Sequence, residues 1–579
     1  MRNALKFVPT AEQAKIIGHD GSAFVEACPG AGKTKVMVER ARHVVASTAT
    51  VFGRGLAFLS FTRAAVSELE SRLYSEGVIG KPTFPHFVGT FDSFVWQFFI
   101  APFGVPGVAQ SPHLLPDKDK LDIAPNNGMR GIPLGCFDRE TGVAIKAKIE
   151  RIGFTGGLLN YETTARIVRE RFLNRAVLDF DDARRLALQR LRDKKGGAAL
   201  LRALQARFVE IIVDEAQDCN PADLEVVACL RDAGVPIKII CDPNQSIYSF
   251  RGGVGDELKT FAATFTDEDR LPLAGNFRSG SNIARVIVAL REPSARGRPD
   301  EALGKHRDEP TPVHLLAFAG HSAPVAVGCK FEALTASLSL NHTQCPIIGS
   351  TLNAARTASG QPKEEPDGGL SYRLAVCIDT YHRAVDMRLK GDALEGFHRI
   401  ALELSGALDN TTYHQHLIEA EIEPNQWRPG AIATLEALRF QPDKHATVDR
   451  WLIDARDVLR HLLPAGSASI ARKLQNKKEL ATAFSLGSVS KHPTHTIHAV
   501  KGKEFDAVCV VLAPKTAKKI MDCLIEGGGT SEDLESARKI YVGASRARRL
   551  LVIAVPKSQA KRLHTHLLGT GALVALSDV

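Results

Sequence analysis

Three short stretches carry residue types that could handle a nucleotide phosphate. The first, "EACPGAGKTK" (26–35), places two glycines, a lysine and a threonine between an apolar run and a helical pattern. Glycine-rich backbone can wrap a phosphate, the lysine can hold its charge, and the threonine hydroxyl can bind Mg²⁺. The full phosphate-loop pattern also has a glycine five positions before Gly32, where this chain has Ala27. A glycine-rich turn therefore stays open for this stretch taken alone.

The second stretch, "FVEIIVDEAQD" (208–218), delivers Asp214 and Glu215 at the end of an apolar run. Ligands of open α/β sheets bind at the carboxyl ends of the strands. Phosphoryl transfer to water needs a carboxylate for Mg²⁺ and a group that orients or deprotonates the attacking water. Asp214 suits the metal and Glu215 suits the water. The alternative for this stretch by itself is an acidic turn that caps a helix.

The third stretch, "CDPNQSIYSFRGG" (241–253), also follows an apolar run. Gln245 could sense a γ-phosphate or its water. Tyr248 and Phe250 alternate with small polar residues and precede Arg251. Aromatic rings beside a cation form a platform on which the bases of a single strand stack. A hairpin with core aromatics is the alternative.

The elements that must position these residues are indicated by short apolar runs, each followed by a helical pattern. Continuous rather than alternating runs favour strands buried on both faces. After the glycine-rich stretch, Met37, Ala41, Val44 and Val45 fall at helical spacing, which gives strand, turn and helix in order. The chain is therefore predicted to be α/β with parallel sheets. The predicted strands lie in residues 22–27, 55–61, 208–214, 235–242, 311–320, 346–350, 507–513 and 550–555.

Bulk composition sets the outer limits. The 579 residues carry 44 % hydrophobic and 24 % charged side chains, which is ordinary for a globular protein of roughly three to five domains. No apolar run is long enough to span a bilayer and "MRNALKFVPT" lacks a signal-peptide core, so we expect a cytoplasmic protein with no membrane contact. The net charge of +9 is compatible with a polyanionic partner. Ten cysteines without metal-ligand spacing predict no zinc, no iron–sulfur cluster and no disulfide framework.

The three stretches, with others between residues 9 and 555, resemble in type and order the motifs of superfamily-one DNA helicases of the UvrD, Rep and PcrA type. The further motifs are "PTAEQAKII", "LSFTRAAVSEL", "VGTFDSFVWQFF", "LDFDDARRLAL", "LAGNFRSGSNI", "THTIHAVKGKEFDAVCVV" and "ARKIYVGASRARRLLVIA". The resemblance implies two RecA-like P-loop motor domains with parallel sheets, each carrying a mainly helical insertion. The first motor domain would occupy 1–104 and 206–272 around an insertion at 105–205, and the second 273–360 and 491–579 around an insertion at 361–490.

The resemblance also implies an ATP site with Mg²⁺. Gln13 would read adenine, Lys33 would hold the β- and γ-phosphates, and Thr34 with Asp214 would hold Mg²⁺. Phe277 would stack on adenine, Glu504 would face the ribose, and Arg546 would be the arginine finger. The implied catalytic set is Lys33, Glu215, Gln245, Arg278 and Arg546. The remaining implied ATP contacts are Ala27, Cys28, Pro29, Gly30, Ala31, Gly32 and Lys35, the last standing where many relatives have Arg.

The DNA contacts implied by the resemblance fall in several of the motifs. They are Phe61, Thr90, Tyr248, Phe250, Arg251 and His498. Asp92 stands where relatives commonly have His. An acidic group is a poor phosphate partner, so we do not expect Asp92 to contact DNA.

Two functions follow as hypotheses. The first is an ATP-dependent 3′–5′ single-stranded DNA translocase or helicase acting on single strands and tailed duplexes, in DNA repair or in anti-phage defence of the Gabija type with a partner nuclease. The second is an ATP-sensing regulatory subunit that binds DNA ends and controls a nuclease. The complete set of catalytic residues favours the first.

Overall fold

The computed structural model describes most of the chain. The described residues are 7–47, 53–126, 129–193, 196–247, 255–297, 299–361, 369–383, 387–408, 413, 416–417, 420–464, 466, 469–476, 480, 484 and 492–579.

The chain divides into two compact units. Unit 1 comprises Met1–Phe99, Arg184–Lys363 and Val489–Val579, and unit 2 comprises Ile100–Ala183 and Glu364–Ser488. Residues 184–205, which the sequence places in the first insertion, group with unit 1, where α8 (Gly196–Arg207) leads directly into strand β8 and packs on it. The other predicted boundaries between motor domains and insertions stay predictions.

The first sheet of unit 1 has six strands in the order β10-β1-β9-β8-β2-β3, and every neighbouring pair is parallel. The strands read as continuous apolar runs because helices cover both faces. Their residues are Ala23–Ala27 (β1), Gly55–Ser60 (β2), Phe87–Thr90 (β3), Phe208–Asp214 (β8), Ile237–Cys241 (β9) and Arg270–Leu273 (β10).

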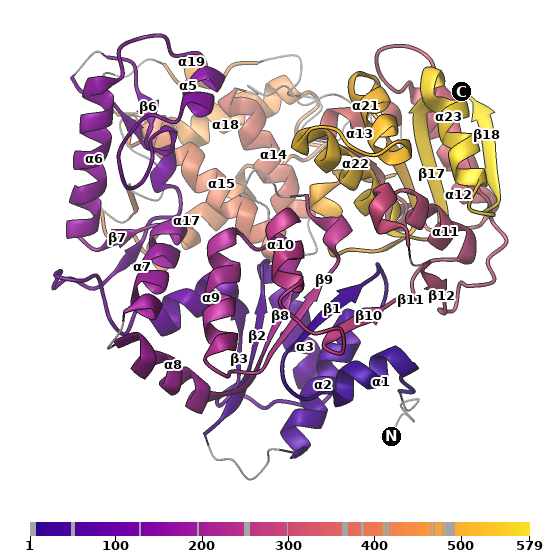
Figure 1. Ribbon diagram of the computed structural model, residues 1–579. Coiled ribbons are helices and arrows are strands. Elements are labelled where there is room, and N and C mark those ends of the chain that lie inside the picture. Colours follow the sequence, from indigo (N-terminus) through magenta and orange to yellow (C-terminus); the bar gives the residue numbers. More distant parts are fainter. Residues whose placement is uncertain are drawn as a thin grey trace. The chain divides into compact units, whose positions relative to one another are not determined.

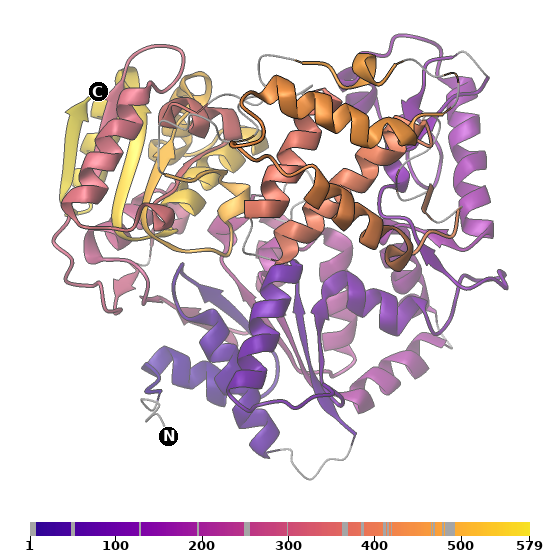
Figure 2. The ribbon, with the colours of Figure 1, turned by 180° about the vertical axis from the view of Figure 1, so that it is seen from behind.

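Crossover helices place the carboxyl ends of these strands together. Figure 1 shows α8 and α9 over one face of the sheet, and the view from behind in Figure 2 shows helices of the first hundred residues over the other. Parallel strands joined by right-handed crossovers require this arrangement. The helices are α1 (Ala11–Gly18), α2 (Lys33–Ser47), α3 (Arg63–Ser75), α4 (Phe91–Val95), α9 (Pro221–Asp232) and α10 (Gly255–Ala262).

The second sheet of unit 1 also has six strands, in the order β15-β14-β16-β17-β13-β18, all in parallel pairs. Two apolar clusters lie on its two faces, one including Val508 and Tyr541 and the other Phe331 and Cys509. The α/β prediction with two parallel sheets is therefore confirmed. The strands are Val313–Phe318 (β13), Ile347–Gly349 (β14), Thr494–Thr496 (β15), Phe505–Val511 (β16), Ala547–Pro556 (β17) and Val574–Asp578 (β18).

The helices around the second sheet include those that carry predicted catalytic segments. A short parallel pair, β11 (Gly275–Asn276) and β12 (Glu301–Ala302), follows the first sheet in the chain. The helices are α11 (Ser281–Ala289), α12 (Val325–Ser337), α13 (Leu352–Ser359), α21 (Pro514–Ile525), α22 (Ser531–Ala544) and α23 (Lys557–Leu568).

Unit 2 is built from helices and a few two-residue strands. Its larger core centres on Trp451, and a smaller one includes Tyr161. Its helices are α5 (Lys146–Arg151), α6 (Leu159–Asn174), α14 (Leu370–Arg383), α15 (Met387–Ser405), α17 (Pro424–Ala437), α18 (Val448–Leu459) and α19 (Ile470–Lys473), and α7 (Phe180–Arg192) begins in unit 2 and ends in unit 1. The short strands are His113–Leu114 (β4), Asp122–Ile123 (β5), Ile132–Pro133 (β6) and Val177–Leu178 (β7).

Within the described ranges, no helix combines the length and the apolar character needed to cross a membrane. The same part of the chain holds no group of three or more His, Cys, Asp or Glu side chains that could bind a metal ion. All ten cysteines are free thiols.

A buried ion pair ties helix α2 to the first sheet. Arg40 donates from Nε to Glu210 Oε1 at 3.1 Å and from Nη2 to Oε2 at 2.6 Å, and both side chains are nearly inaccessible. Lys238 Nζ on the next strand lies 3.9 Å from Glu210 Oε2, and burial lowers the pKa of Lys238 to about 8. One carboxylate therefore compensates two buried cations.

We expect Glu210→Gln to destabilise the protein strongly. Removing the single negative charge leaves two cations in a dry environment, and breaking a buried pair in this way costs about 3–5 kcal/mol. Glu68→Gln is the control, because Glu68 pairs with Arg72 at 2.7 Å on an exposed helix face, where a pair contributes less than about 1 kcal/mol. Urea unfolding followed by circular dichroism measures both. Equal shifts in the two variants would contradict the account.

Candidate active site

The glycine-rich loop between β1 and α2 has two backbone positions that only glycine adopts readily. Gly30 and Gly32 have φ of +73° and +77°. Gly30 also faces the start of the second motor domain: a Cβ there would lie 2.6 Å from both Arg278 Cβ and Asn276 Oδ1. Phe277 N donates to Gly30 O at 2.8 Å. The loop is thus shaped for a phosphate and is in contact with a second predicted motif.

Lys33, the first residue of α2, points at the end of strand β8. Its Nζ donates to Glu215 Oε1 at 2.6 Å. Burial alone would lower the pKa of Lys33, but the charges of Glu215 and Asp214 outweigh it and raise that pKa. Burial would likewise raise the pKa of Glu215, and Lys33 and Lys501 lower it instead. The structure therefore joins the predicted phosphate lysine and the predicted base in one ion pair.

Glu215 is held in an unusual backbone conformation. It has φ +55° and ψ +40°, in the left-handed region, directly after β8. A non-glycine residue there costs roughly 1–3 kcal/mol and persists only where its surroundings require it. Here the turn aims the carboxylate at Lys33, and Gln217 Nε2 donates to its other oxygen. The strain thus serves to fix the direction of one carboxylate.

Asp214 fits a cation. Its Oδ1 is buried and has no hydrogen-bond partner among the described residues, so one carboxylate oxygen is left uncompensated. Burial, together with the adjacent charge of Glu215, raises the pKa of Asp214 above its ordinary value. An oxygen ligand in this state suits Mg²⁺, which binds proteins through one or two carboxylates and its substrate's phosphates. Thr34, at the start of α2, and Asp214 are the side chains that would hold it.

Gln245 joins the two sheets of unit 1. It follows β9, and its Nε2 donates to Asp242 Oδ2 at 2.8 Å, while its Oε1 accepts from Arg546 Nη2 at 2.5 Å. Arg546 is 2 % exposed and also donates from Nε to Val542 O at 3.0 Å. Burial, with the nearby charge of Arg278, lowers the pKa of Arg546 to about 10. The predicted sensor and the predicted arginine finger therefore touch directly.

Arg278 and Glu504, predicted for the γ-phosphate and the ribose, pair with each other. Arg278 Nε donates to Glu504 Oε2 at 2.7 Å, and its Nη1 donates to Ser545 O at 2.9 Å. Glu504 also accepts from Arg548 Nη2 at 2.7 Å. Burial alone would raise the pKa of Glu504, but the two arginines lower it to about 2. The two predicted nucleotide contacts are therefore joined in one ion pair.

The two predicted adenine contacts, Phe277 and Gln13, differ in their exposure. Phe277 is 37 % exposed, so its ring has a free surface for stacking. Gln13 is buried: its Oε1 accepts from Thr10 N at 3.1 Å and its Nε2 donates to Ala31 O at 3.3 Å, so both ends of the amide bind backbone. Lys35 is not brought to the site, because its ammonium pairs with Glu39 at 2.9 Å and Glu76 at 2.8 Å.

Three of the predicted DNA contacts, Phe61, Thr90 and His498, fall within the described residues, and all three lie at or just after the end of a strand. Ser60 and Thr90 are register partners at the ends of β2 and β3, Phe61 follows β2 directly, and the rings of Phe61 and Phe91 stack at 5.7 Å. His498 Nε2 lies 3.2 Å from Ile247 O. Tyr248, Phe250 and Arg251 lie outside the described residues. Asp92 binds Arg184, which also pairs with Asp223 at 2.6 Å.

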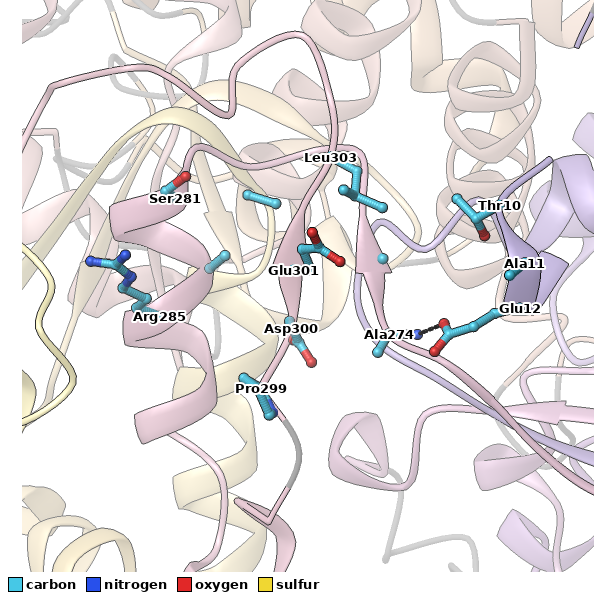
Figure 3. Close-up of a pocket in the computed structure, with 13 residues that line it drawn as sticks. Thr10, Ala11, Glu12, Ala274, Ser281, Arg285, Pro299, Asp300, Glu301 and Leu303 are labelled. Carbon is cyan, nitrogen blue, oxygen red and sulfur yellow. Dashed lines mark hydrogen bonds between the residues drawn. The ribbon is translucent and has the colours of Figure 1, made fainter. Parts of the chain in front are cut away.

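A cavity of about 870 Å³ lies beside helix α1, next to the predicted ATP residues but not among them. In Figure 3, Glu12 of α1 accepts a hydrogen bond from Ala274 N, at 2.7 Å, and Asp300 and Glu301 lie across the opening. Among the described residues, the predicted ATP contacts do not line it. A smaller cavity of about 220 Å³ is lined by Ala27, Cys28 and Asp242 of the site itself. This smaller cavity therefore adjoins the phosphate loop at Ala27 and Cys28.

Four residues of this cluster were not singled out by the sequence. Lys501 binds Asp218 at 2.6 Å and also donates to Gln245 O at 3.1 Å. Tyr541 OH donates to Asp242 Oδ2 at 3.0 Å. Lys501, Asp218, Tyr541 and Asp242 all lie inside motifs found in the sequence. The motifs do not indicate which of their residues contact each other in the folded chain.

Two parallel sheets, a phosphate loop on the first and arginines from the second directed at one buried cluster define a P-loop protein with two RecA-like domains. Residues 9–111 and 158–266 match the model of the UvrD/REP helicase N-terminal domain. These residues therefore form a UvrD/REP helicase N-terminal domain, and the relatives described next support the resemblance to UvrD-type superfamily-one helicases seen in the sequence.

Curated relatives agree with this assignment. The chain is 24 % identical over 593 residues to ATP-dependent DNA helicase UvrD2 of Mycobacterium tuberculosis, covering 94 % of this chain and 78 % of the relative. It is 28 % identical over 399 residues to ATP-dependent DNA helicase UvrD1 of the same species, covering 64 % and 50 %. It is 25 % identical over 303 residues to ATP-dependent DNA helicase PcrA of Bacillus subtilis, covering 50 % and 40 %.

The Lys33–Glu215 pair predicts opposite outcomes for its two members. Glu215→Gln should still bind ATP, because it leaves the Lys33 ammonium free for phosphate, but turnover should fall about 10²–10⁴-fold, the usual contribution of a general base. Lys33→Ala should lose nucleotide binding and turnover together. Phosphate release and binding of a fluorescent nucleotide measure the two.

Glu225→Gln serves as the control, since Glu225 lies on the nearby helix α9 and pairs with the exposed Arg192. It should match wild type in both measurements. Near wild-type turnover in Glu215→Gln would show that the water is activated by another group.

Proposed function

We propose that this protein is an ATP hydrolase coupled to DNA unwinding, a 3′–5′ single-stranded DNA translocase and helicase that uses Mg²⁺. The observation that carries the proposal is the meeting of Lys33 and Glu215 at one strand end with Gln245 and Arg546 bonded to each other across the two sheets. Relatives of the same family are named ATP-dependent DNA helicases. The 3′–5′ direction rests on the family resemblance.

The ion pairs suggest how nucleotide binding starts the cycle. The γ-phosphate of ATP competes with Glu215 for the Lys33 ammonium, and the carboxylate then becomes free to accept a proton from the attacking water. Mg²⁺ held by Asp214 and Thr34 would neutralise phosphate charge. Arg546 and Arg278 would then bind the transferring phosphoryl group, and an arginine finger contributes about 10³–10⁵ to the rate.

Coupling to DNA follows from the chain order after Gln245. Gln245 contacts Arg546. Two residues after Gln245 in the same segment, Ile247 O contacts His498. Tyr248 and Phe250, our predicted base platform, come next in the sequence. A change at the phosphate therefore has a short covalent path to the bases. Hydrolysis and phosphate release remove the γ-phosphate that both arginines would bind. The two domains can then separate and change their contacts with the DNA strand.

The direct test uses duplexes with a 3′ or a 5′ single-stranded tail and excess ATP. We expect strand displacement from the 3′-tailed duplex, with ATP hydrolysis stimulated by single-stranded DNA. Glu215→Gln, which binds ATP without turnover, is the control for displacement by binding alone. Absence of displacement from both substrates, with no DNA-stimulated hydrolysis, would contradict the motor and favour an ATP-sensing subunit.

Phe250→Ala should weaken DNA binding without affecting basal ATP hydrolysis. We expect basal ATP hydrolysis to stay near wild type, single-strand binding to weaken by about 1–3 kcal/mol for one lost base stack, and DNA stimulation to fall. Phe84→Ala is the matched control: Phe84 is 66 % exposed, but it precedes β3 at the amino end of the sheet. Fluorescence anisotropy with a labelled oligonucleotide measures the affinities, and equal losses in both variants would contradict the platform.

We propose DNA repair or anti-phage defence with a nuclease partner as the setting. The two settings differ in partner. Purification of the tagged chain from its native host, followed by mass spectrometry, should recover a nuclease in the defence setting, and Lys33→Ala prepared in parallel shows whether the complex depends on nucleotide.

A further inference from the structure

Asp242 lies between the two sheets of unit 1 and accepts hydrogen bonds from both sides. It follows strand β9 and is 1 % exposed. Its Oδ2 accepts from Gln245 Nε2 at 2.8 Å, from its own domain, and from Tyr541 OH at 3.0 Å, from helix α22 of the second domain. Its Oδ1 accepts from Asn244 N at 3.0 Å. Both carboxylate oxygens thus accept from the first domain, and the second domain adds a further donor to Oδ2.

Tyr541 is itself held firmly. Its side chain is fully buried, and the guanidinium carbon of Arg291 lies 5.7 Å from its ring centroid. Arg291 is in turn held by Asp300, with Nη2 to Oδ2 at 2.5 Å. Burial, and the adjacent charge of Asp242, raise the pKa of the Tyr541 phenol well above its ordinary value. The hydroxyl therefore stays protonated and stays a donor.

The carboxylate also fixes which way the Gln245 amide faces. The amide nitrogen of Gln245, which can only donate, faces the Oδ2 acceptor of Asp242. The amide oxygen is then left facing outward, where it accepts from Arg546 Nη2. Tyr541 and Arg546 come from the same chain segment at the end of α22, where Arg546 Nε donates to Val542 O. One segment therefore contacts Asp242 and Gln245 at once.

We propose that Tyr541 is a positioning residue for the hydrolysis step, whose hydroxyl, bonded to Asp242, sets the register of Arg546 on Gln245 when the two motor domains close. The inference rests on the proposed function and extends it to a residue that acts through Asp242, Gln245 and Arg546. Without the hydroxyl, Asp242 loses its only described donor from the second domain, and Arg546 keeps a single contact to the first through Gln245.

Tyr541→Phe tests the proposal, because it removes one oxygen and keeps the ring beneath Arg291. We expect kcat for DNA-stimulated ATP hydrolysis to fall about tenfold or more, the scale of one lost hydrogen bond to a charged group, with KM nearly unchanged. The affinity for ADP with aluminium fluoride, which stands in for the transferring phosphoryl group, should fall by a similar factor while the affinity for ADP alone does not change.

Tyr161→Phe is the matched control, since Tyr161 is equally buried and its hydroxyl donates to Arg130 O at 2.8 Å within unit 2. It should leave all three quantities at wild-type values. A combined Tyr541→Phe, Gln245→Ala variant separates positioning from general loosening. If Tyr541 acts through Gln245, the double variant should turn over no more slowly than Gln245→Ala.

The outcomes distinguish failure of the positioning role of Tyr541 from failure of the proposed function. Wild-type kcat and wild-type affinity for the aluminium fluoride complex in Tyr541→Phe would overturn the positioning role and leave the proposed function intact. Multiplying effects in the double variant, or equal losses for ADP and its aluminium fluoride complex with a lowered melting temperature, would also overturn it. A wild-type chain that neither binds nor hydrolyses ATP would overturn the proposed function, and this inference with it.

Discussion

The hydrogen bond between Arg546 and Gln245 is the contact on which the rest of the site depends. It joins the end of a helix on one parallel sheet to the end of a strand on the other, and both partners are almost fully buried. A buried guanidinium needs acceptors, and a buried amide needs both of its ends satisfied. These needs draw in Asp242 on one side and Val542 O on the other. The two sheets are thus connected through polar groups that are stable only when all of them are paired.

The same logic explains the charges around the phosphate loop. The Lys33 ammonium is paired with the carboxylate of Glu215. Lys501 of the second domain and Asp218 of the first form another buried pair beside them. Breaking a buried pair by removing one partner is strongly destabilising, whereas exchanging one anion for another need not be. A site arranged in this way can accept and release a polyanion by exchange of partners.

One departure from the family pattern also has a physical account. Asp92 stands where relatives commonly carry His, and Arg184 lies between Asp92 and the deeply buried Asp223. Arg184 lies on α7, close to the point where the chain passes from unit 2 to unit 1. The acidic residue therefore has a partner within unit 1, consistent with its being a poor phosphate ligand. The segment after β3 is thus held by an ion pair.

The sequence by itself determined the fold class and the identity of the main chemical groups, because those signals are local. Continuous apolar runs mark buried parallel strands, and glycine, lysine, Asp214 and Glu215 stand at fixed offsets from the strand ends. Tertiary structure decided which of these groups touch. Lys33 and Glu215 are 182 residues apart, and Asp242 and Tyr541 are 299 apart. It also turned Lys35 toward Glu39 and Glu76 and committed both ends of the Gln13 amide to backbone. A motif fixes the type of each residue, but only the packing of two sheets fixes the partner that satisfies its buried charge.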